Sequence, residues 1–226
     1  MASTITLQNV VDWVRTHPKL IPQVGVAGFS SEPALGICNS VIQEMLSPPY
    51  NWKFNSAEAT PFNTSENAQD YTAAITDMGW LESATIEDTN STQTPKPRGA
   101  LECVQLLQPS SDKDNPSQLC WLKDTGTQIT FRLDRPAGSF VWRIYPVYQK
   151  KAPLKTALAN TWSPIPDELA YVYRQGVLAY AYRHVDDGKF QVEYARFQQF
   201  INKALGLADA EHNAEGFYPS TPIMVG

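Results

Sequence analysis

The stretches FVWRIYPVY (residues 140–148) and WSPIPDELAYVYRQGVLAYAYRH (residues 162–184) follow each other closely but have different periods. In the first, apolar and polar side chains alternate, which is typical of a β-strand with one buried face. In the second, apolar side chains recur at helical spacing, namely Leu169, Val172, Tyr173, Gly176, Val177 and Tyr180. This change of period indicates that a β-domain ends near residue 149 and that helical structure follows it.

Toward the N-terminus, short runs rich in Thr, Val, Ile and aromatic residues continue back to Trp52, separated by turn-forming clusters. The candidate strands are residues 52–54, 80–88, 100–107, 118–122, 127–133 and 140–148. Two long polar stretches, residues 89–99 and 108–117, are predicted to be flexible hairpin tips. Residues 51–149 are therefore predicted to form a small antiparallel β-sandwich or barrel of about six strands.

Helical spacing is found on both sides of this region. The predicted helices cover residues 4–17, 31–47, 166–184 and 189–208. Because amphipathic helices bury their apolar stripes against one another, residues 1–50 and 150–208 are predicted to form a four-helix bundle. Residues 209–226 contain two prolines and two glycines and are predicted to be an extended arm. The predicted fold class is α+β: a four-helix bundle with an inserted small antiparallel β-sandwich or barrel and an extended C-terminal arm.

The charge balance limits the possible partners. The chain has 226 residues and a formal net charge of -5. An acidic protein is disfavoured at a phosphate backbone, where binding depends on Lys and Arg that release counterions. The basic residues are scattered, and the nearest approach to a patch is Lys150-Lys151 with Lys155. Sequence-specific nucleic-acid binding is therefore not expected, whereas a pore whose acidic lining repels passing DNA would fit this balance.

The N-terminal sequence and the cysteines suggest a compartment. There is no basic stretch followed by an apolar core, and no apolar run approaches the roughly 20 residues that span a bilayer. We therefore expect a protein that is made in the cytoplasm and has no membrane partner. The three cysteines, Cys38, Cys103 and Cys120, lie among apolar residues and are expected to be unpaired core residues.

No catalytic, cofactor-binding or metal-binding pattern stands out in the sequence. Walker and GxGxxG phosphate loops and the GxSxG nucleophile elbow are missing. The three histidines, which lack ligands at zinc-type spacing, are His17, His184 and His212. The carboxylate pairs at 167–168 and 186–187 are explained by a helix start and by a helix-breaking turn. The prediction is a protein that is not an enzyme, with no catalytic residue, no cofactor and no metal.

The aromatic residues of the helix over residues 166–184 exceed what one core-facing stripe needs. Core packing explains Tyr173 and Tyr180, whereas Tyr171 and Tyr182 lie on other faces. Tyrosine is enriched at subunit interfaces, so these two are candidate interface residues, with ordinary exposed tyrosine as the equal alternative. Four tryptophans fall in the predicted β-region: Trp52, Trp80, Trp121 and Trp142. They are expected to form its core, with a carbohydrate-stacking platform as the alternative.

Several segments resemble a known family of virion proteins. They are SVIQEMLSPPYNWKFNSAEATPF (residues 40–62), DMGWLESATIED (residues 77–88), KAPLKTALANTWSPIPDELAYVYRQGVLAYAYRH (residues 151–184) and the helix through FQQFINKALGLAD. In order and layout, residues 31–209 are similar to head-to-tail adaptor proteins of short-tailed phages, which are also called gatekeeper or tail tubular proteins. The longer N-terminus, with its PKLIPQVGVAG loop, departs from the compact versions of these proteins.

The resemblance implies a structural protein at the head–tail junction of the virion, assembled as a ring of twelve subunits below the portal. It implies that the helices contact the portal and neighbouring subunits, that the C-terminal arm docks on the portal, and that the β-domain meets the tail nozzle. Genome DNA would pass through the ring during ejection without sequence-specific binding. The implied anchors in the arm are Phe217, Tyr218, Pro219, Ile223 and Met224. Two alternatives remain: another neck or tail protein, such as a terminator or tube component, and a virion protein with a glycan-binding β-domain.

Overall fold

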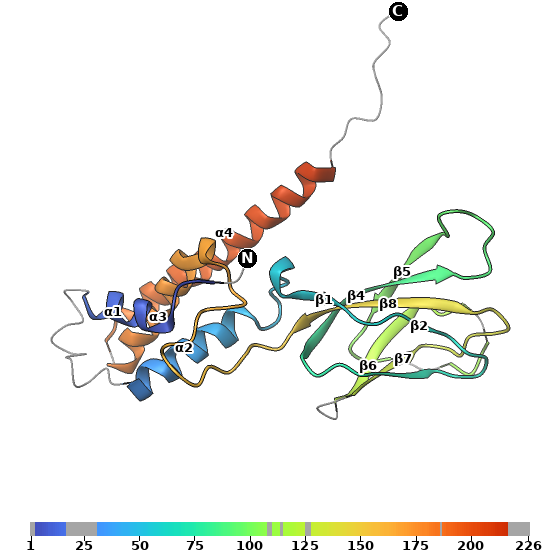
Figure 1. The fold of residues 1–226 in the computed structure, drawn as a ribbon, viewed down its shortest axis with the longest axis horizontal. Helices are drawn as coiled ribbons and strands as arrows, with labels where there is room; N and C mark the ends of the chain where they lie inside the picture. Colours follow the sequence, from blue (N-terminus) through green and yellow to red (C-terminus); the bar gives the residue numbers. More distant parts are fainter. Residues whose placement is uncertain are drawn as a thin grey trace, which may run out of the picture. The chain divides into compact units, whose positions relative to one another are not determined.

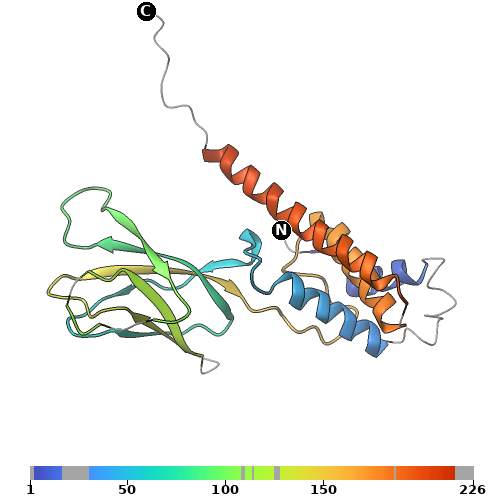
Figure 2. The ribbon, with the colours of Figure 1, turned by 180° about the vertical axis from the view of Figure 1, so that it is seen from behind.

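A computed structural model describes residues 3–16, 31–107, 110–113, 115–124, 128–185 and 187–216. The chain divides into two compact units, which are described separately. Residues 1–54 and 152–226 form the helical unit, and residues 55–151, inserted between them, form the β-unit (Figures 1 and 2). Each unit has an apolar core of its own.

The helical unit contains α1 (Leu7–Arg15), α2 (Ser31–Met45), α3 (Ala170–His184) and α4 (Phe190–Gly216), with a 3-10 turn, η2 (Asp167–Leu169), before α3. α1 begins at a capping box. The Asn9 backbone N–H donates to Thr6 Oγ1 at 3.2 Å, and the Thr6 N–H donates to Asn9 Oδ1 at 3.0 Å. The four predicted helices are confirmed in type and order.

The C-terminal end of α4 differs from the prediction. We expected an extended arm from residue 209, but α4 continues to Gly216. The physical reason is local composition, because residues 208–215 are rich in alanine and glutamate, which favour helix, and contain no proline or glycine. The predicted arm over residues 209–226 is therefore helical in its first part, and residues 217–226 lie outside the described residues.

The helices do not form the four-helix bundle that we predicted. α1 has nine residues and α4 has 27, so their lengths are roughly 14 and 40 Å and they cannot share one bundle axis. Instead, α3 is the helix against which the other three pack. At Gly176, α3 lies close to both α2 and α4. A Cβ atom added there would lie 2.8 Å from Val41 Cγ1 of α2 and 2.8 Å from Phe197 Cε2 of α4.

Tryptophans from outside the helices complete the core of the helical unit. The rings of Trp162 and Tyr173 stack with centroids 4.2 Å apart, and both side chains are fully buried. Trp52 also belongs to this core and donates its Nε1–H to the Met45 carbonyl at 2.6 Å. The strand predicted over residues 52–54 is therefore wrong, because this anchored tryptophan leads into a 3-10 turn, η1 (Lys53–Asn55).

The carboxylate of Asp167 holds the N-terminal segment. It accepts hydrogen bonds from the Ser3 and Thr4 hydroxyls, each at 2.5 Å, and from the Thr4 and Ile5 backbone N–H groups at 3.0 and 3.3 Å. These bonds, the one from Ser3 first, hold the pKa of Asp167 far below its usual value. Asp167 lies in the first turn of η2, where the sequence predicts a helix start, and its side chain also fixes the chain that leads into α1.

The β-unit is a curled, mixed sheet with eight strands among the described residues. The strands are β1 (Ser56–Glu58), β2 (Phe62–Asn63), β3 (Asp70–Ala73), β4 (Met78–Asp88), β5 (Arg98–Cys103), β6 (Gln118–Asp124), β7 (Ile129–Leu133) and β8 (Trp142–Lys150). Their order across the sheet is β1-β8-β4-β5-β6-β7-β3, and β2 also pairs with β8. Phe62 of β2 stacks on Tyr71 of β3 with ring centroids 4.8 Å apart. This contact brings the two ends of the sheet together, so the sheet forms a half-barrel.

One strand pair corrects the antiparallel sheet that we predicted. β5 and β6 are parallel, with Glu102 opposite Gln118 and Cys103 opposite Leu119. A parallel pair needs a crossover of about a dozen residues or more, and residues 104–117 supply it. The polar stretch over residues 108–117 is therefore part of a crossover rather than a hairpin tip. The other predicted tip does join an antiparallel pair, β4 and β5.

A buried carboxylate fixes the end of this crossover. Asp134, which follows β7 and is 4% exposed, accepts hydrogen bonds from the Ser117 N–H at 3.0 Å, the Ser117 hydroxyl at 2.7 Å and the Gln118 N–H at 3.2 Å. Burial alone would raise the pKa of Asp134, but these bonds and one from Arg135 lower it below its usual value. The carboxylate thus ties the start of β6 to the end of β7.

Candidate functional site

A carboxylate joins three helices in the helical unit. Glu44 of α2 accepts hydrogen bonds from the hydroxyls of Tyr180 of α3 and Tyr194 of α4, both at 2.6 Å, and from the Gln198 amide of α4. The Tyr50 hydroxyl donates to Gln198 Oε1 at 2.7 Å. Burial, and after it Glu44, raises the pKa of Tyr180. The pKa of Tyr194 is also raised, with the hydrogen bond to Glu44 as the largest cause. All donors are neutral, so the arrangement is suited to holding helices together.

The sequence pattern does not predict this polar cluster, because core packing alone explains Tyr180 there. The available signal was Glu44 itself, which lies one turn after Val41 on the apolar side of a helix. A carboxylate at such a position needs hydrogen-bond donors from neighbouring elements. The two tyrosines and the glutamine supply them.

Of the two candidate interface tyrosines, one is buried and the other is exposed. Tyr182 is 1% exposed and belongs to the core of the helical unit, with Lys189 Nζ 5.4 Å from its ring centroid. Packing within the chain therefore accounts for Tyr182. Tyr171 is 39% exposed and contacts Phe200 of α4 edge-on, with ring centroids 5.5 Å apart.

Tyr171 belongs to a group of side chains from three helices, which we call the helical aromatic surface: Trp13, Tyr171, Arg174 and Phe200. Trp13 and Tyr171 are exposed, whereas Arg174 and Phe200 are half-buried. The Arg174 guanidinium lies 6.0 Å from the ring centroid of Trp13, which is 38% exposed. Trp, Tyr and Arg are the residues that most often dominate binding energy at protein interfaces. Sequence reasoning found only Tyr171. Arg174, three residues later on the same helix face, was the available signal.

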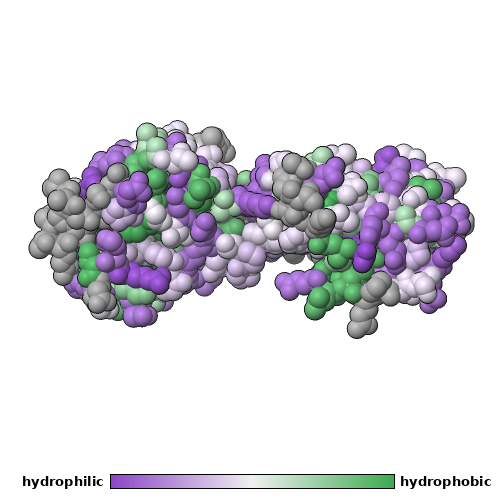
Figure 3. All heavy atoms as spheres, turned by 90° about the horizontal axis from the view of Figure 1, so that it is seen from below, coloured by the Kyte–Doolittle hydropathy of each residue, from purple (hydrophilic) through white to green (hydrophobic). Residues whose placement is uncertain are grey.

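Large exposed apolar residues of the β-unit lie on β6 and in the loop before β8, with one more, Leu106, in the crossover between β5 and β6. Trp121 and Leu122 are 38% and 46% exposed, and Phe140 and Val141 are 58% and 40% exposed. Trp121 pairs with Phe131 and Lys123 with Thr130, so Leu122 is the extra residue of a β-bulge. On the face drawn in Figure 3, the β-unit at the right carries a patch of apolar atoms among polar ones. These positions are available to a partner protein.

The remaining predicted anchors are in the C-terminal segment. Phe217, Tyr218, Pro219, Ile223 and Met224 lie outside the described residues. The helix that leads to them is described, and in Figures 1 and 2 its last turns run clear of α1, α2 and α3.

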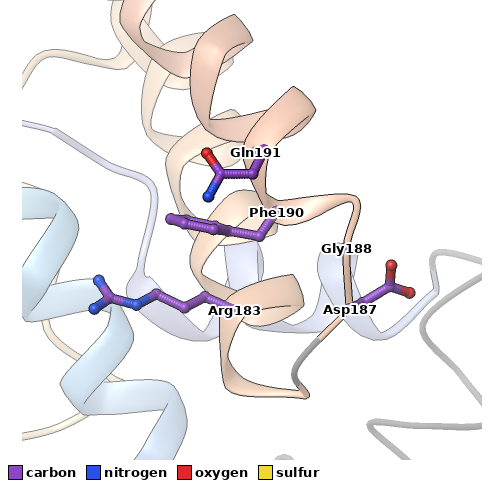
Figure 4. Close-up of a pocket in the computed structure, with 5 residues that line it drawn as sticks. All are labelled: Arg183, Asp187, Gly188, Phe190 and Gln191. Carbon is purple, nitrogen blue, oxygen red and sulfur yellow. The ribbon is translucent and has the colours of Figure 1, made fainter.

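A shallow hollow at the turn between α3 and α4 does not have the form of an active site. It is lined by Arg183, Asp187, Gly188, Phe190 and Gln191 and encloses about 210 Å³. Pockets that bind small molecules usually enclose roughly 300–1,000 Å³. Figure 4 shows that the side chains of Arg183 and Asp187 point away from each other. Charged groups that do not converge cannot act together on one substrate.

The nucleophiles and possible metal ligands have ordinary surroundings. Burial raises the pKa of the Cys38 thiol to about 12 and that of Cys103 to about 11, so both are protonated at neutral pH. Cys38, Cys103 and Cys120 are all free, as predicted. Within the described ranges, no three His, Cys, Asp or Glu side chains are grouped to hold a metal ion. No helix in that part of the chain is long and apolar enough to cross a membrane.

Comparison with known proteins agrees with a protein built for contacts rather than for catalysis. The family model of the SU10 adaptor protein matches residues 30–222, which include most of the helical unit and the whole β-unit. No curated protein matches the chain. Since the matched range is well over half of the sequence, the chain belongs to the SU10 adaptor protein family, whose members are phage structural adaptors and not enzymes.

Proposed function

We propose that copies of this protein form a ring that joins the portal of a phage head to its tail and surrounds the passing genome. The match over residues 30–222 is the observation that carries this proposal, because it spans both units. A ring of twelve follows from the resemblance to adaptors of short-tailed phages. The net charge of -5 supports a channel component that repels DNA, since tight binding would slow its passage.

In this proposal the C-terminal segment binds the portal. Residues 217–226 begin where α4 ends and carry five apolar or ring-containing anchors, Phe217, Tyr218, Pro219, Ile223 and Met224. A short apolar segment that lacks a core of its own gains order when it is buried on a partner, and this cost delays binding until the partner is present. The exposed residues on β6 and before β8 are the proposed contacts of the β-unit with the tail.

The test is to mix purified portal with the full chain or with a chain that ends at Gly216, and to measure the mass of the complexes by light scattering. The full chain should join the portal. The shortened chain should keep the circular dichroism spectrum of the helical and β-units but remain separate, because it lacks the anchors. Normal binding by the shortened chain would refute the role of the C-terminal segment.

A matched pair of variants separates the anchors from the mere length of the segment. Phe217→Ser with Ile223→Ser should lose portal binding, whereas Ser220→Ala with Thr221→Ala should keep it. If the full chain joins neither a portal nor a tail complex under any of these conditions, the adaptor role itself is refuted.

A further inference from the structure

Two cations of this region have no carboxylate partner among the described residues: Arg174 within the helical aromatic surface and Lys203 beside it. Arg174 lies one turn after Tyr171 on α3, and Lys203 lies one turn after Phe200 on α4. Among the described residues, neither Arg174 nor Lys203 forms an ion pair, and Arg174 Nε is buried without a hydrogen-bond partner. The neighbouring Arg196 does have a partner, Glu193, at 2.9 Å. The surface therefore has positive charge that the described side chains do not neutralise.

Such a surface suits a partner that carries carboxylates beside small apolar residues. A guanidinium binds a carboxylate with paired hydrogen bonds, and the aromatic rings of Trp13, Tyr171 and Phe200 cover apolar groups. An isolated guanidinium N–H that is shielded from water gains more from a new acceptor than an exposed one does. Every copy has a net charge of -5, so two copies repel overall, and a second copy is complementary only where it presents a local group of carboxylates to this surface.

The last turns of α4 have this chemistry. Among the α4 side chains that the structure describes, Leu205 is the last that packs against the core of the helical unit, and the helix ends at Gly216. These turns extend roughly 16 Å further. Their sequence contains Asp209, Glu211 and Glu215 among alanines, and no Lys or Arg follows Lys203 in the chain. The end of the helix is thus acidic, and it runs clear of α1, α2 and α3 (Figures 1 and 2).

We propose that the helical aromatic surface, with Arg174 and Lys203, binds the acidic last turns of α4 from a second copy of the chain. The contact cannot form within one copy, because α4 is one continuous helix that carries its own last turns away from Phe200. A surface that binds a different surface of the next copy is a heterologous contact, which closes into a ring when the rotation between copies allows it. The inference rests on the proposed function and specifies how its copies meet.

The test uses the full chain and measures its association by sedimentation velocity across concentration at low and high salt. Wild-type chains should associate, and association should weaken as salt screens the charges. Arg174→Glu with Lys203→Glu should lower the association constant roughly tenfold or more, as should Asp209→Lys with Glu215→Lys. An equimolar mixture of the two variants should recover association, because each supplies the surface that the other lacks.

A control variant has the same change in net charge elsewhere on the helical unit. Lys53→Glu with Arg183→Glu should associate like the wild type, and thermal unfolding of every variant should confirm that it is folded. Wild-type chains that stay monomeric both alone and on the portal overturn the inference, as does a mixture that recovers nothing. The inference is also overturned if Arg174→Glu with Lys203→Glu loses binding to duplex DNA and keeps copy–copy association.

Portal binding distinguishes this inference from the proposed function. Arg174→Glu with Lys203→Glu should still bind the portal through residues 217–226 but should not fill a complete ring, as judged by the mass of the complex. A complete ring formed by this variant overturns the inference and leaves the adaptor role intact. Failure of the wild type to join the portal overturns the adaptor role, whatever the copies do to one another.

Discussion

Among the glycines of the helical unit that the structure describes, Gly176 has the least room for a Cβ atom, and replacing it with alanine tests the packing of the helices directly. In a helix, alanine in place of glycine is favourable by about 1 kcal/mol, because it restricts the unfolded chain and suits helical geometry. At Gly176 the new methyl group would lie 2.8 Å from Val41 Cγ1 and 2.8 Å from Phe197 Cε2. Both distances are far shorter than van der Waals contact, so one of the neighbours must move.

Neither neighbour can move at low cost. Val41 and Phe197 are fully buried, and a β-branched side chain in a helix has essentially one rotamer available. Overpacking of a filled core costs about 1–3 kcal/mol. With three atoms closer than or at 3.0 Å, the upper part of that range applies, and the helix-propensity gain of about 1 kcal/mol offsets only part of it. Gly176→Ala should therefore lower the free energy of unfolding by about 1–2 kcal/mol.

The assay is urea unfolding of the helical unit, followed by circular dichroism at the helical band. Gly36→Ala in α2 and Gly206→Ala in α4 are matched controls, since a Cβ atom at either position meets nothing within 4 Å. Both should raise the free energy of unfolding by about 0.5–1 kcal/mol. A Phe197→Leu change should remove part of the Gly176→Ala effect, as a coupling in a double-mutant cycle. If Gly176→Ala is as stable as Gly36→Ala, the close packing of α3 between α2 and α4 is wrong.

Two further predictions concern carboxylates that accept several hydrogen bonds, the buried Asp134 and the half-buried Glu44. Asp134→Ala should lower the free energy of unfolding of the β-unit by about 1–3 kcal/mol, because it removes the acceptor of the Ser117 and Gln118 N–H groups. Asp112→Ala, in the crossover before β6, should have little effect. The pKa of Asp134 is lowered by folding, so its contribution is present above the unfolded pKa and is lost as pH falls through the folded one. Asp134→Ala should therefore flatten the loss of stability below about pH 4, and an unchanged acid limb in urea titrations would contradict this. The hydrogen bond to Glu44 is the largest cause of the raised pKa of Tyr194, so Glu44→Gln should lower that pKa. The change can be followed by the NMR signals of labelled tyrosine as pH rises.

Periodicity was sufficient to predict the helices and the long strands. The spacing of Leu7, Val10 and Val14 predicts α1, and all three side chains are fully buried. The alternation in residues 140–148 predicts β8, the strand that pairs with β1, β2 and β4. In these elements the local pattern and the tertiary packing favour the same structure, so the pattern alone is informative.

The short strands and the sheet connectivity could not be predicted in this way. β1, β2 and β3 contain two to four residues each, too few for a period, and they are strands only because β8 and β7 offer edges to pair with. The parallel pairing of β5 with β6 is made across the crossover of residues 104–117, where no local period indicates which strands will pair. For the candidate site, the helical spacing predicts that Tyr171 lies outside the core-facing stripe. Phe200, which contacts Tyr171, and Trp13, which contacts Arg174, come from helices distant in sequence and could not be predicted in this way.

The two ends of the β-unit lie side by side. Ser56 in its first strand is opposite Gln149 in its last, and the Asn55 side chain donates to the Lys150 carbonyl at 2.9 Å. Because pairing within the β-unit holds its two ends together, the insertion acts in the helical unit as a short closed loop. The conformational entropy lost on closing that loop does not grow with the length of the insertion. Related chains can thus keep one helical framework and exchange the module grafted onto it, as long as each replacement begins and ends on neighbouring strands.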